Sequence, residues 1–137
     1  MLFDVWLVAK SVTGLLDEAL EPSGLSADEF GVYSVLTSAE AMTPSLLARW
    51  MSAPPTTVSS YVKRLESRGH LERERNPADG RSYVLRLTAS GRAAHRRAGQ
   101  AFLPVLGAVV GELGNGEASV RASLRRLHRA VEATARP

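Results

Sequence analysis

The chain has 137 residues, and its seventeen Lys and Arg against fourteen Asp and Glu give a formal net charge of +3. Hydrophobic residues make up 45 % of it, a composition typical of globular and not of disordered proteins. Because the chain has no cysteine, disulfides, thiolate zinc sites, iron–sulfur clusters and cysteine-based redox sensing are excluded.

The start of the chain and its apolar segments favour a cytoplasmic location. The first residues carry the acidic Asp4 and no basic residue, so we expect no secretory signal peptide. The longest apolar stretch, residues 101–110, contains a proline and a glycine and is about half as long as a membrane span. We therefore expect a cytoplasmic protein that does not contact a membrane.

The positive charge is concentrated in the middle of the chain. Between Lys63 and Arg97, ten basic residues against four acidic ones leave a net charge of +6, and the rest of the chain carries −3. Fifteen of the seventeen basic residues are arginine, whose guanidinium group binds phosphates and base edges through paired hydrogen bonds. This pattern indicates an anionic partner, although composition alone equally allows a solvated basic face without one.

Four helices are expected in the first half of the chain. They are residues 2–20, a segment that follows a capping box formed by Ser26 and Glu29, residues 44–51 and residues 56–68. The last two are short and separated only by a tight break at residues 52–55, which indicates a helix-turn-helix. Val58, Val62 and Leu65 share one face of the fourth helix, so we expect them to point into the core.

A β-hairpin is expected next. After Gly69, which ends the fourth helix, the hydrophobic period changes to two. Residues 71–75 form the first expected strand, residues 76–80 are a cluster of turn-forming residues, and residues 83–87 form the return strand. Arginines at positions 73, 75 and 81 give this hairpin a basic tip.

Two more helices complete the chain. Thr88 caps a long helix from Ala89 to about Leu113, and the last helix covers residues 117–135. Pro104 lies inside the long helix and predicts a kink or a break there. The first and last helices have apolar stripes that face water unless another surface covers them. The fold class is mainly α with a small β-hairpin.

The chain resembles the MarR family of winged-helix transcriptional regulators over nearly its whole length. The segments that carry the resemblance are Thr57-Val58-Ser59 with Val62 and Arg64-Leu65-Glu66 (recognition helix), Arg68-Gly69-His70-Leu71-Glu72-Arg73 (passage to the wing), Asp79-Gly80-Arg81 (the wing-tip D-x-R motif), and Leu87-Thr88 with Gly91 (start of the long dimer helix). Each segment is weak evidence by itself, but all four occur in order at the expected separations. Gly80 replaces the frequent second arginine of the wing tip.

The resemblance implies one MarR-type domain over residues 1–137. Its winged helix-turn-helix lobe is expected at residues 27–88, flanked by N- and C-terminal dimerisation helices at 1–21 and 89–137. A homodimer is therefore expected, and its interface residues are Val5, Val12, Leu124, Leu127 and Val131. A two-fold dimer presents its recognition helices to successive major grooves, so we expect a near-palindromic operator.

The expected DNA-binding residues lie on the recognition helix and the wing. They are Thr56, Thr57, Ser59, Ser60, Lys63 and Arg64 on the helix, and Arg73, Arg75, Asp79 and Arg81 on the wing. By resemblance, Arg81 enters the minor groove, where narrow A·T-rich stretches attract guanidinium groups. Asp79 either orients Arg81 or Arg73 or is a plain turn residue. Arg73 either contacts DNA or bridges helix and wing, and the sequence leaves both open.

In this family a ligand often binds between the dimer region and the DNA-binding lobe. Trp6, Phe30, Tyr33 and Phe102 are candidates to line such a pocket, and the alternative is that they are core residues. No polar anchor stands out among them, so the sequence indicates a small-molecule effector without identifying it.

The sequence gives no indication of an enzyme. It contains no G-x-S-x-G, P-loop or H-E-x-x-H motif, and its three histidines lack metal-ligand spacing, so we expect no catalysis, metal or cofactor. We predict a sequence-specific regulator that binds double-stranded DNA, a ligand-responsive repressor. The alternative is a winged-helix module that binds other proteins, which the basic residues of the recognition helix and wing disfavour.

Overall fold

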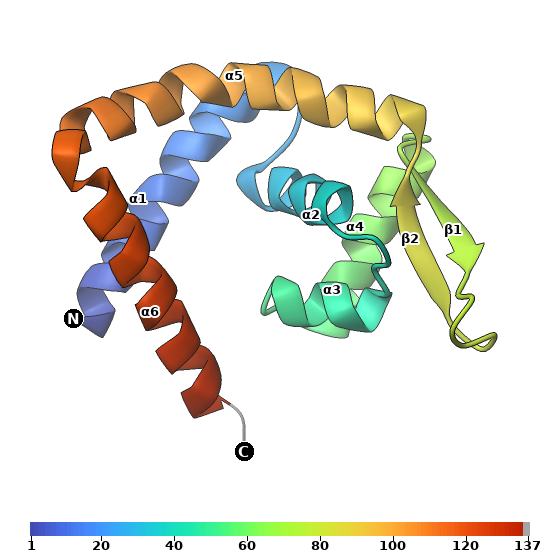
Figure 1. The fold of residues 1–137 in the computed structure, drawn as a ribbon. Coiled ribbons are helices and arrows are strands. Elements are labelled where there is room, and N and C mark those ends of the chain that lie inside the picture. Colours follow the sequence, from blue (N-terminus) through green and yellow to red (C-terminus); the bar gives the residue numbers. More distant parts are fainter. Residues whose placement is uncertain (136–137) are drawn as a thin grey trace. The chain divides into compact units, whose positions relative to one another are not determined.

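The computed structural model describes residues 1–135 and divides the chain into two compact units, Met1–Phe102 and a second that begins at Leu103. The first unit contains α1 (Leu2–Leu20), a 3-10 turn (Glu21–Ser23), α2 (Ala27–Ser38), α3 (Pro44–Trp50), α4 (Pro55–Ser67), β1 (Leu71–Arg75), β2 (Tyr83–Leu87) and the first part of α5 (Ala89–Leu113) (Figure 1). The second contains the rest of α5, a 3-10 turn (Gly114–Gly116) and α6 (Glu117–Ala135). The expected mainly α fold with one hairpin is confirmed.

Local capping explains where α2 and α3 begin. The Ser26 hydroxyl accepts from the Glu29 N–H at 3.1 Å, and the Glu29 carboxylate accepts from the Ser26 N–H at 3.2 Å, which confirms the capping box of α2. The Thr43 hydroxyl accepts from the Leu46 N–H at 3.2 Å and caps α3. Both α3 and α4 end one residue earlier than the sequence predicted.

Two prolines and a left-handed serine make the turn between α3 and α4. Ser52 has a φ of 48°, a conformation that a non-glycine residue adopts only at some cost. Pro54 is the N-cap residue of α4, and Pro55 occupies its first turn, where the missing N–H has no helical partner in any case. The Pro54 carbonyl accepts from the Thr57 N–H at 3.0 Å, so α4 starts directly after this turn.

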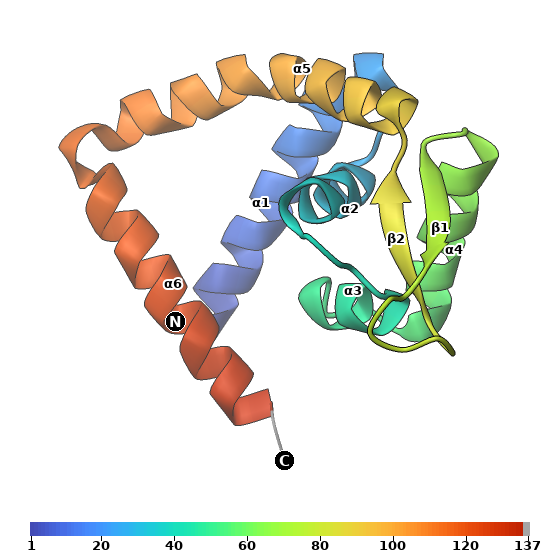
Figure 2. The same ribbon diagram turned by 45° about the vertical axis from the view of Figure 1, so that its right-hand side comes forward.

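The hairpin is attached to the helix-turn-helix along β2. Its strands are antiparallel, with Leu71 opposite Leu87 and Arg75 opposite Tyr83. The Leu85 N–H donates to the Met42 carbonyl at 2.7 Å, which joins β2 to the loop before α3. Figures 1 and 2 show the hairpin beside α4, so the expected wing is confirmed and stands next to the expected recognition helix.

Two glycines allow the chain to turn from α4 into the hairpin and to pack α5 on the turn. Gly69 has a φ of +69°, the left-handed conformation of a helix C-terminus. A Cβ atom on Gly91 would overlap the carbonyl oxygen of His70. Thr88 completes this junction, because its hydroxyl donates to the Gly69 carbonyl at 2.7 Å and its N–H donates to the His70 carbonyl at 3.0 Å.

The hydrophobic core lies within the first unit. Its most buried large side chains are Leu20, Val32, Tyr33, Leu47, Val58, Leu65 and Val84. Val58, Val62 and Leu65 of α4 are all buried, as their spacing predicted. Glu29 is the only buried charged residue among those that the structure describes.

The part of the chain that follows Phe102 has no buried side chain among its described residues. Here α5 continues through Pro104 without interruption, so of the predicted kink or break the break does not occur. Pro104 and Gln100 are both exposed, so water can solvate the Gln100 carbonyl that the proline leaves without its helical donor. The last helix has its predicted bounds. No helix within residues 1–135 is long and apolar enough to cross a membrane.

Candidate nucleic-acid interface

The exposed face of α4 carries the short polar side chains that the sequence singled out. Val58 and Leu65 anchor the opposite face in the core. The residues predicted to contact DNA on this helix are exposed, namely Thr56, Ser59, Ser60, Lys63 and Arg64, and Thr57 is half-buried. The structure thus presents these residues to a partner.

Arg64 is tied to the protein as well as exposed. Its Nε atom lies 3.2 Å from Glu29 Oε1, and its guanidinium lies 4.9 Å from the centre of the Tyr61 ring. Arg68 Nη2 lies 3.3 Å from the same carboxylate oxygen. Tyr61 also donates its hydroxyl proton to Asp28 Oδ2 at 3.1 Å. These contacts hold α4 against the first turn of α2, a role for Arg64 that the sequence did not predict.

Arg73 bridges the recognition helix and the wing. Its Nε and Nη2 atoms donate to the two carboxylate oxygens of Glu66, at 2.5 and 2.8 Å. The guanidinium also lies 4.7 Å from the centre of the Tyr83 ring on β2. The hydrogen bond from Arg73 lowers the pKa of the Glu66 carboxyl group. Of the two roles left open for Arg73, the structure shows the bridging one.

The wing tip is a hydrogen-bonded turn in which Asp79 has a structural role. Asp79 Oδ1 accepts from the Arg81 backbone N–H at 3.1 Å, and the Asp79 carbonyl accepts from the Ser82 N–H at 3.1 Å. Within residues 1–135 its carboxylate bonds to no guanidinium group, so of the two roles left open for Asp79 the structure shows that of a turn residue. A short aspartate side chain reaches the N–H two residues ahead more readily than a distant side chain.

Two wing arginines remain available to a partner. Arg75 and Arg81 are both exposed, and neither forms an ion pair with a residue that the structure describes. Arg75 lies along the tip, because a Cβ atom on Gly80 would come within 3.3 Å of Arg75 Nη2. Arg81 lines a hollow of about 490 Å³ together with Thr43 at the start of α3, so the tip lies next to the helix-turn-helix.

The four aromatic residues proposed for a ligand pocket do not gather into one. Tyr33 is fully buried, and its hydroxyl lies 2.7 Å from His70 Nδ1. Phe30 packs between the His95 and Phe102 rings, at centroid distances of 5.1 and 5.9 Å. Trp6 is exposed on α1 and stacks on Phe3, apart from the other three. Tyr33, Phe30 and Phe102 are thus packing residues in one chain, because burial and ring stacking use their faces, whereas Trp6 stays exposed.

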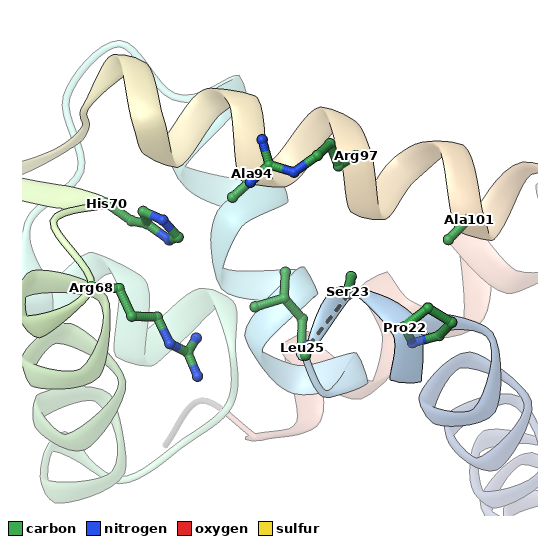
Figure 3. A pocket seen from close by; sticks show the side chains of 9 residues that line it. Pro22, Ser23, Leu25, Arg68, His70, Ala94, Arg97 and Ala101 are labelled. Atoms are coloured by element: carbon green, nitrogen blue, oxygen red, sulfur yellow. Dashed lines mark hydrogen bonds between the residues drawn. The ribbon is translucent and has the colours of Figure 1, made fainter.

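A pocket of about 430 Å³ lies nearby and has none of these four aromatics in its walls (Figure 3). Its polar walls are Ser23, Arg68, His70 and Arg97, and its apolar walls include Leu25, Ala94 and Ala101. Burial, together with the positive charges of Arg68 and Arg97, lowers the pKa of His70. The sequence missed this pocket because its walls come from three separate parts of the chain.

The residues expected at a dimer interface are exposed or half-buried in the single chain. Val12 on α1 is 46 % exposed, and Leu124 and Val131 on α6 are 53 % and 49 % exposed. Val5 and Leu127 are half-buried. Each helix therefore presents an apolar face to solvent that a further protein surface would cover favourably.

Comparison with known proteins gives consistent matches. A family model described as "MarR family" matches residues 23–82. The HTH-type transcriptional repressor Rv2887 of Mycobacterium tuberculosis is 35 % identical over 80 residues, which are 58 % of this chain and 58 % of that protein. The chain thus matches less than two thirds of that relative's length. The multiple antibiotic resistance protein MarR of Salmonella typhimurium is 30 % identical over 100 residues, 70 % of this chain and 69 % of that protein.

A solved structure extends the match beyond the family segment. The crystal structure of the M. tuberculosis transcriptional regulator MosR in complex with DNA has a TM-score of 0.80 and 28 % sequence identity. The superposition covers 97 % of this chain and 96 % of that one. The similarity therefore includes the terminal helices as well as the helix-turn-helix and the hairpin.

Proposed function

Because this chain belongs to the MarR family of transcriptional regulators, we propose that it is a cytoplasmic repressor that binds a near-palindromic operator as a homodimer. The observation that carries this proposal is the pairing of an exposed, hydroxyl-rich face on α4 with a wing whose two tip arginines have no acidic partner among the described residues. The similar MosR structure was solved with DNA, which supports this interpretation.

On the recognition helix, short side chains contact base edges and long side chains contact phosphates. Ser59 and Ser60, in the first half of α4, are short enough to let the helix approach the floor of the major groove and bond to base edges. Lys63, one turn later, is exposed and reaches phosphates. Arg64 binds DNA only through the part of its guanidinium that Glu29 leaves free.

On the wing, Arg81 inserts into the minor groove and Arg75 binds the adjacent backbone. Both contacts are electrostatically favourable, since the segment from Lys63 to Arg97 carries a net charge of +6. Arg73 supports the wing from inside by its paired hydrogen bonds to Glu66. In this proposal the lobe that binds DNA is residues 27–88.

The terminal helices form the dimer in this proposal. A second copy covers Val5 and Val12 on α1 and Leu124, Leu127 and Val131 on α6, which are exposed or half-buried in one chain. Residues 1–21 and 89–137 then form the dimerisation region, of which residues 136 and 137 lie outside the described part. The two recognition helices read half-sites about one helical turn apart.

No enzymatic reaction belongs to this function, since the family regulates transcription. A module that binds only other proteins is not proposed, because such a surface has no need for uncompensated arginines at the wing tip. A small-molecule effector would act by changing the affinity for the operator, with a coupling typically of ~1–3 kcal/mol.

Selection of bound fragments from random or genomic DNA tests the proposal directly. We expect a near-palindrome whose half-site centres lie about one helical turn apart. The affinity for the selected duplex should fall steeply with salt, with log K decreasing by ~0.9 per phosphate contact against log salt. Recovery of no enriched sequence, together with a flat salt dependence, would contradict DNA binding.

A further inference from the structure

Arg64 lies on the face of α4 that carries the exposed hydroxyl groups. It follows Ser60 by about one helical turn, so the two residues share one stripe of the helix, and both are exposed. An arginine at such a place has the reach and the donors to bind guanine, the commonest base-specific contact in a major groove. Its position alone therefore makes Arg64 a candidate reader of guanine.

The side chain of Arg64 is instead drawn towards α2. Its Nε atom lies 3.2 Å from Glu29 Oε1, and its guanidinium lies 4.9 Å from the centre of the Tyr61 ring. Tyr61 is buried, and its hydroxyl donates to Asp28 Oδ2 at 3.1 Å, so the ring beside Arg64 is also fixed to α2. These contacts hold the guanidinium near the first turn of α2.

Glu29 opposes the release of Arg64 because its carboxylate is buried. Only 8 % of the Glu29 side chain is exposed, against 51 % of that of Arg64. Arg68 Nη2 lies 3.3 Å from the same carboxylate oxygen, and the Ser26 N–H donates to the other. A buried carboxylate that loses a charged partner is strongly destabilised. A contact between Arg64 and a base would thus have to offset the cost of leaving Glu29 with Arg68 as its one arginine.

We propose that Glu29 is a specificity-determining residue of operator recognition, because it withholds the Arg64 guanidinium from the base edges. The helix then reads its half-site through the exposed hydroxyl-bearing residues of α4, and Arg64 binds no guanine of that half-site. Arg64 contributes to affinity through backbone phosphates, which carry no sequence information directly. The inference rests on the proposed function, since it names the kind of half-site that this helix selects.

Hydroxyl groups and an arginine select different bases. An arginine pairs with guanine, whereas a serine or threonine bonds to several base edges and a threonine methyl group packs on thymine. The Ser60 hydroxyl already donates to the Thr56 carbonyl at 3.1 Å, which leaves its oxygen to accept from an amino group of adenine or cytosine. We therefore expect α4 to contact edges of adenine, cytosine and thymine.

Selection of bound fragments from random DNA, with the unmodified chain and with Arg64→Ala, tests the role of Arg64. We expect both chains to enrich the same half-site, and the affinity of Arg64→Ala to be lower by a similar factor on every sequence. A guanine that the unmodified chain selects and Arg64→Ala does not would overturn the proposal. This comparison leaves Glu29 in place with Arg68 as its partner, so it remains decisive if a Glu29 variant fails to fold.

Glu29→Gln tests the withholding directly. The glutamine oxygen still accepts from the Ser26 N–H and preserves the capping box, but the charge that holds Arg64 is lost. We expect a new preference for guanine at one position of each half-site, at least about fivefold over the other bases, the lower end of discrimination by an arginine–guanine pair. The double variant Glu29→Gln with Arg64→Ala should lose this preference, and circular dichroism should show unchanged helix content.

Glu72→Gln is the matched control for charge. Glu72 is exposed and forms no ion pair with a described residue, and its substitution changes the net charge by the same amount. Because loss of a negative charge favours DNA in general, Glu72→Gln should bind the same half-site as tightly as the unmodified chain or slightly more tightly. An unchanged base preference in Glu29→Gln, or a guanine preference that persists in the double variant, would overturn the proposal.

The selections also separate this inference from the proposed function. A chain that enriches a near-palindrome but reads guanine through Arg64 overturns this inference and leaves the proposed function intact. A chain that enriches no sequence overturns both.

Discussion

The two compact units differ in what their apolar side chains touch. In the first unit, the helix-turn-helix, the wing and the start of α5 bury a continuous core that includes Val32, Leu47 and Leu65. In the second unit no described side chain is buried, and Leu103, Leu124 and Val131 are largely exposed. The helix α1, although part of the first unit, behaves like the second, since Leu20 is its only buried residue. One region therefore folds on itself, and the other presents surfaces that a second chain can cover.

The largest expected effect comes from a charge on the uncovered apolar face. Leu127→Asp places a carboxylate where the proposed partner packs, and an unpaired charge buried at an interface costs at least about 3 kcal/mol. We expect sedimentation velocity to show monomer or aggregate. The control Ala122→Asp adds the same charge at an exposed position on the opposite side of α6. An intact dimer with Leu127→Asp would contradict the assigned interface.

A second substitution tests the region that folds on itself. In Gly91→Ala the new methyl group meets the His70 carbonyl, where α5 packs on the start of the hairpin. We expect the free energy of unfolding to fall by roughly 1–3 kcal/mol in a denaturant titration. Gly99→Ala on the same helix has open space around its Cβ and should gain up to about 1 kcal/mol. Similar unfolding free energies for the two variants would show that position 91 tolerates a side chain.

Two arginines of the wing should separate binding from stability. Arg81→Ala should weaken operator binding by about 1–3 kcal/mol at fixed salt and leave the unfolding free energy and the dimer unchanged. Arg73→Ala should lower the unfolding free energy by about 1 kcal/mol, because it removes a paired bond to Glu66 that is partly exposed to solvent. If Arg81→Ala binds as tightly as the unmodified chain, the minor-groove role is wrong.

The smallest effect concerns pH. Burial lowers the pKa of His70 and of His95 below their usual value of 6.5. Both histidines therefore bind protons more readily in the unfolded chain than in the folded one. The free energy of unfolding falls as the pH drops below about 6.5 towards the pKa values of the folded chain. Chemical denaturation at pH 7.5 and 5.5 should show this loss, and His70→Gln with His95→Gln should reduce it. The carboxyl group of Glu66 contributes only at more acidic pH, because its pKa is lowered.

Local patterns predicted the elements of this fold well. The capping box at Ser26, the left-handed Gly69 and the alternation from Leu71 to Leu87 involve neighbours in sequence, and each places its element within one residue. For Pro104 the sequence could not decide between a kink and a break, because the cost of a proline depends on whether the carbonyl one turn earlier reaches water, and exposure is not encoded locally.

Contacts between distant segments could not be predicted in the same way. Glu29 was identified as a cap, but its partners Arg64 and Arg68 come 35 and 39 residues later, and nothing in the spacing connects them. Arg73 was left with two roles because the choice depends on the position of Glu66 across a turn. The Asp79 carboxylate bonds to the nearby backbone N–H of Arg81 and not to a guanidinium group.

The two tryptophans of the chain are both exposed, Trp6 on α1 at 53 % and Trp50 at the end of α3 at 65 %. Indole fluorescence shifts when water leaves the ring, so each residue reports on its own surroundings. Trp6→Phe leaves a single tryptophan, at the end of α3 in the helix-turn-helix, and Trp50→Phe leaves one on a helix that should meet the second copy. Subunit assembly and docking on the duplex can thus be followed as separate optical signals, without an attached dye.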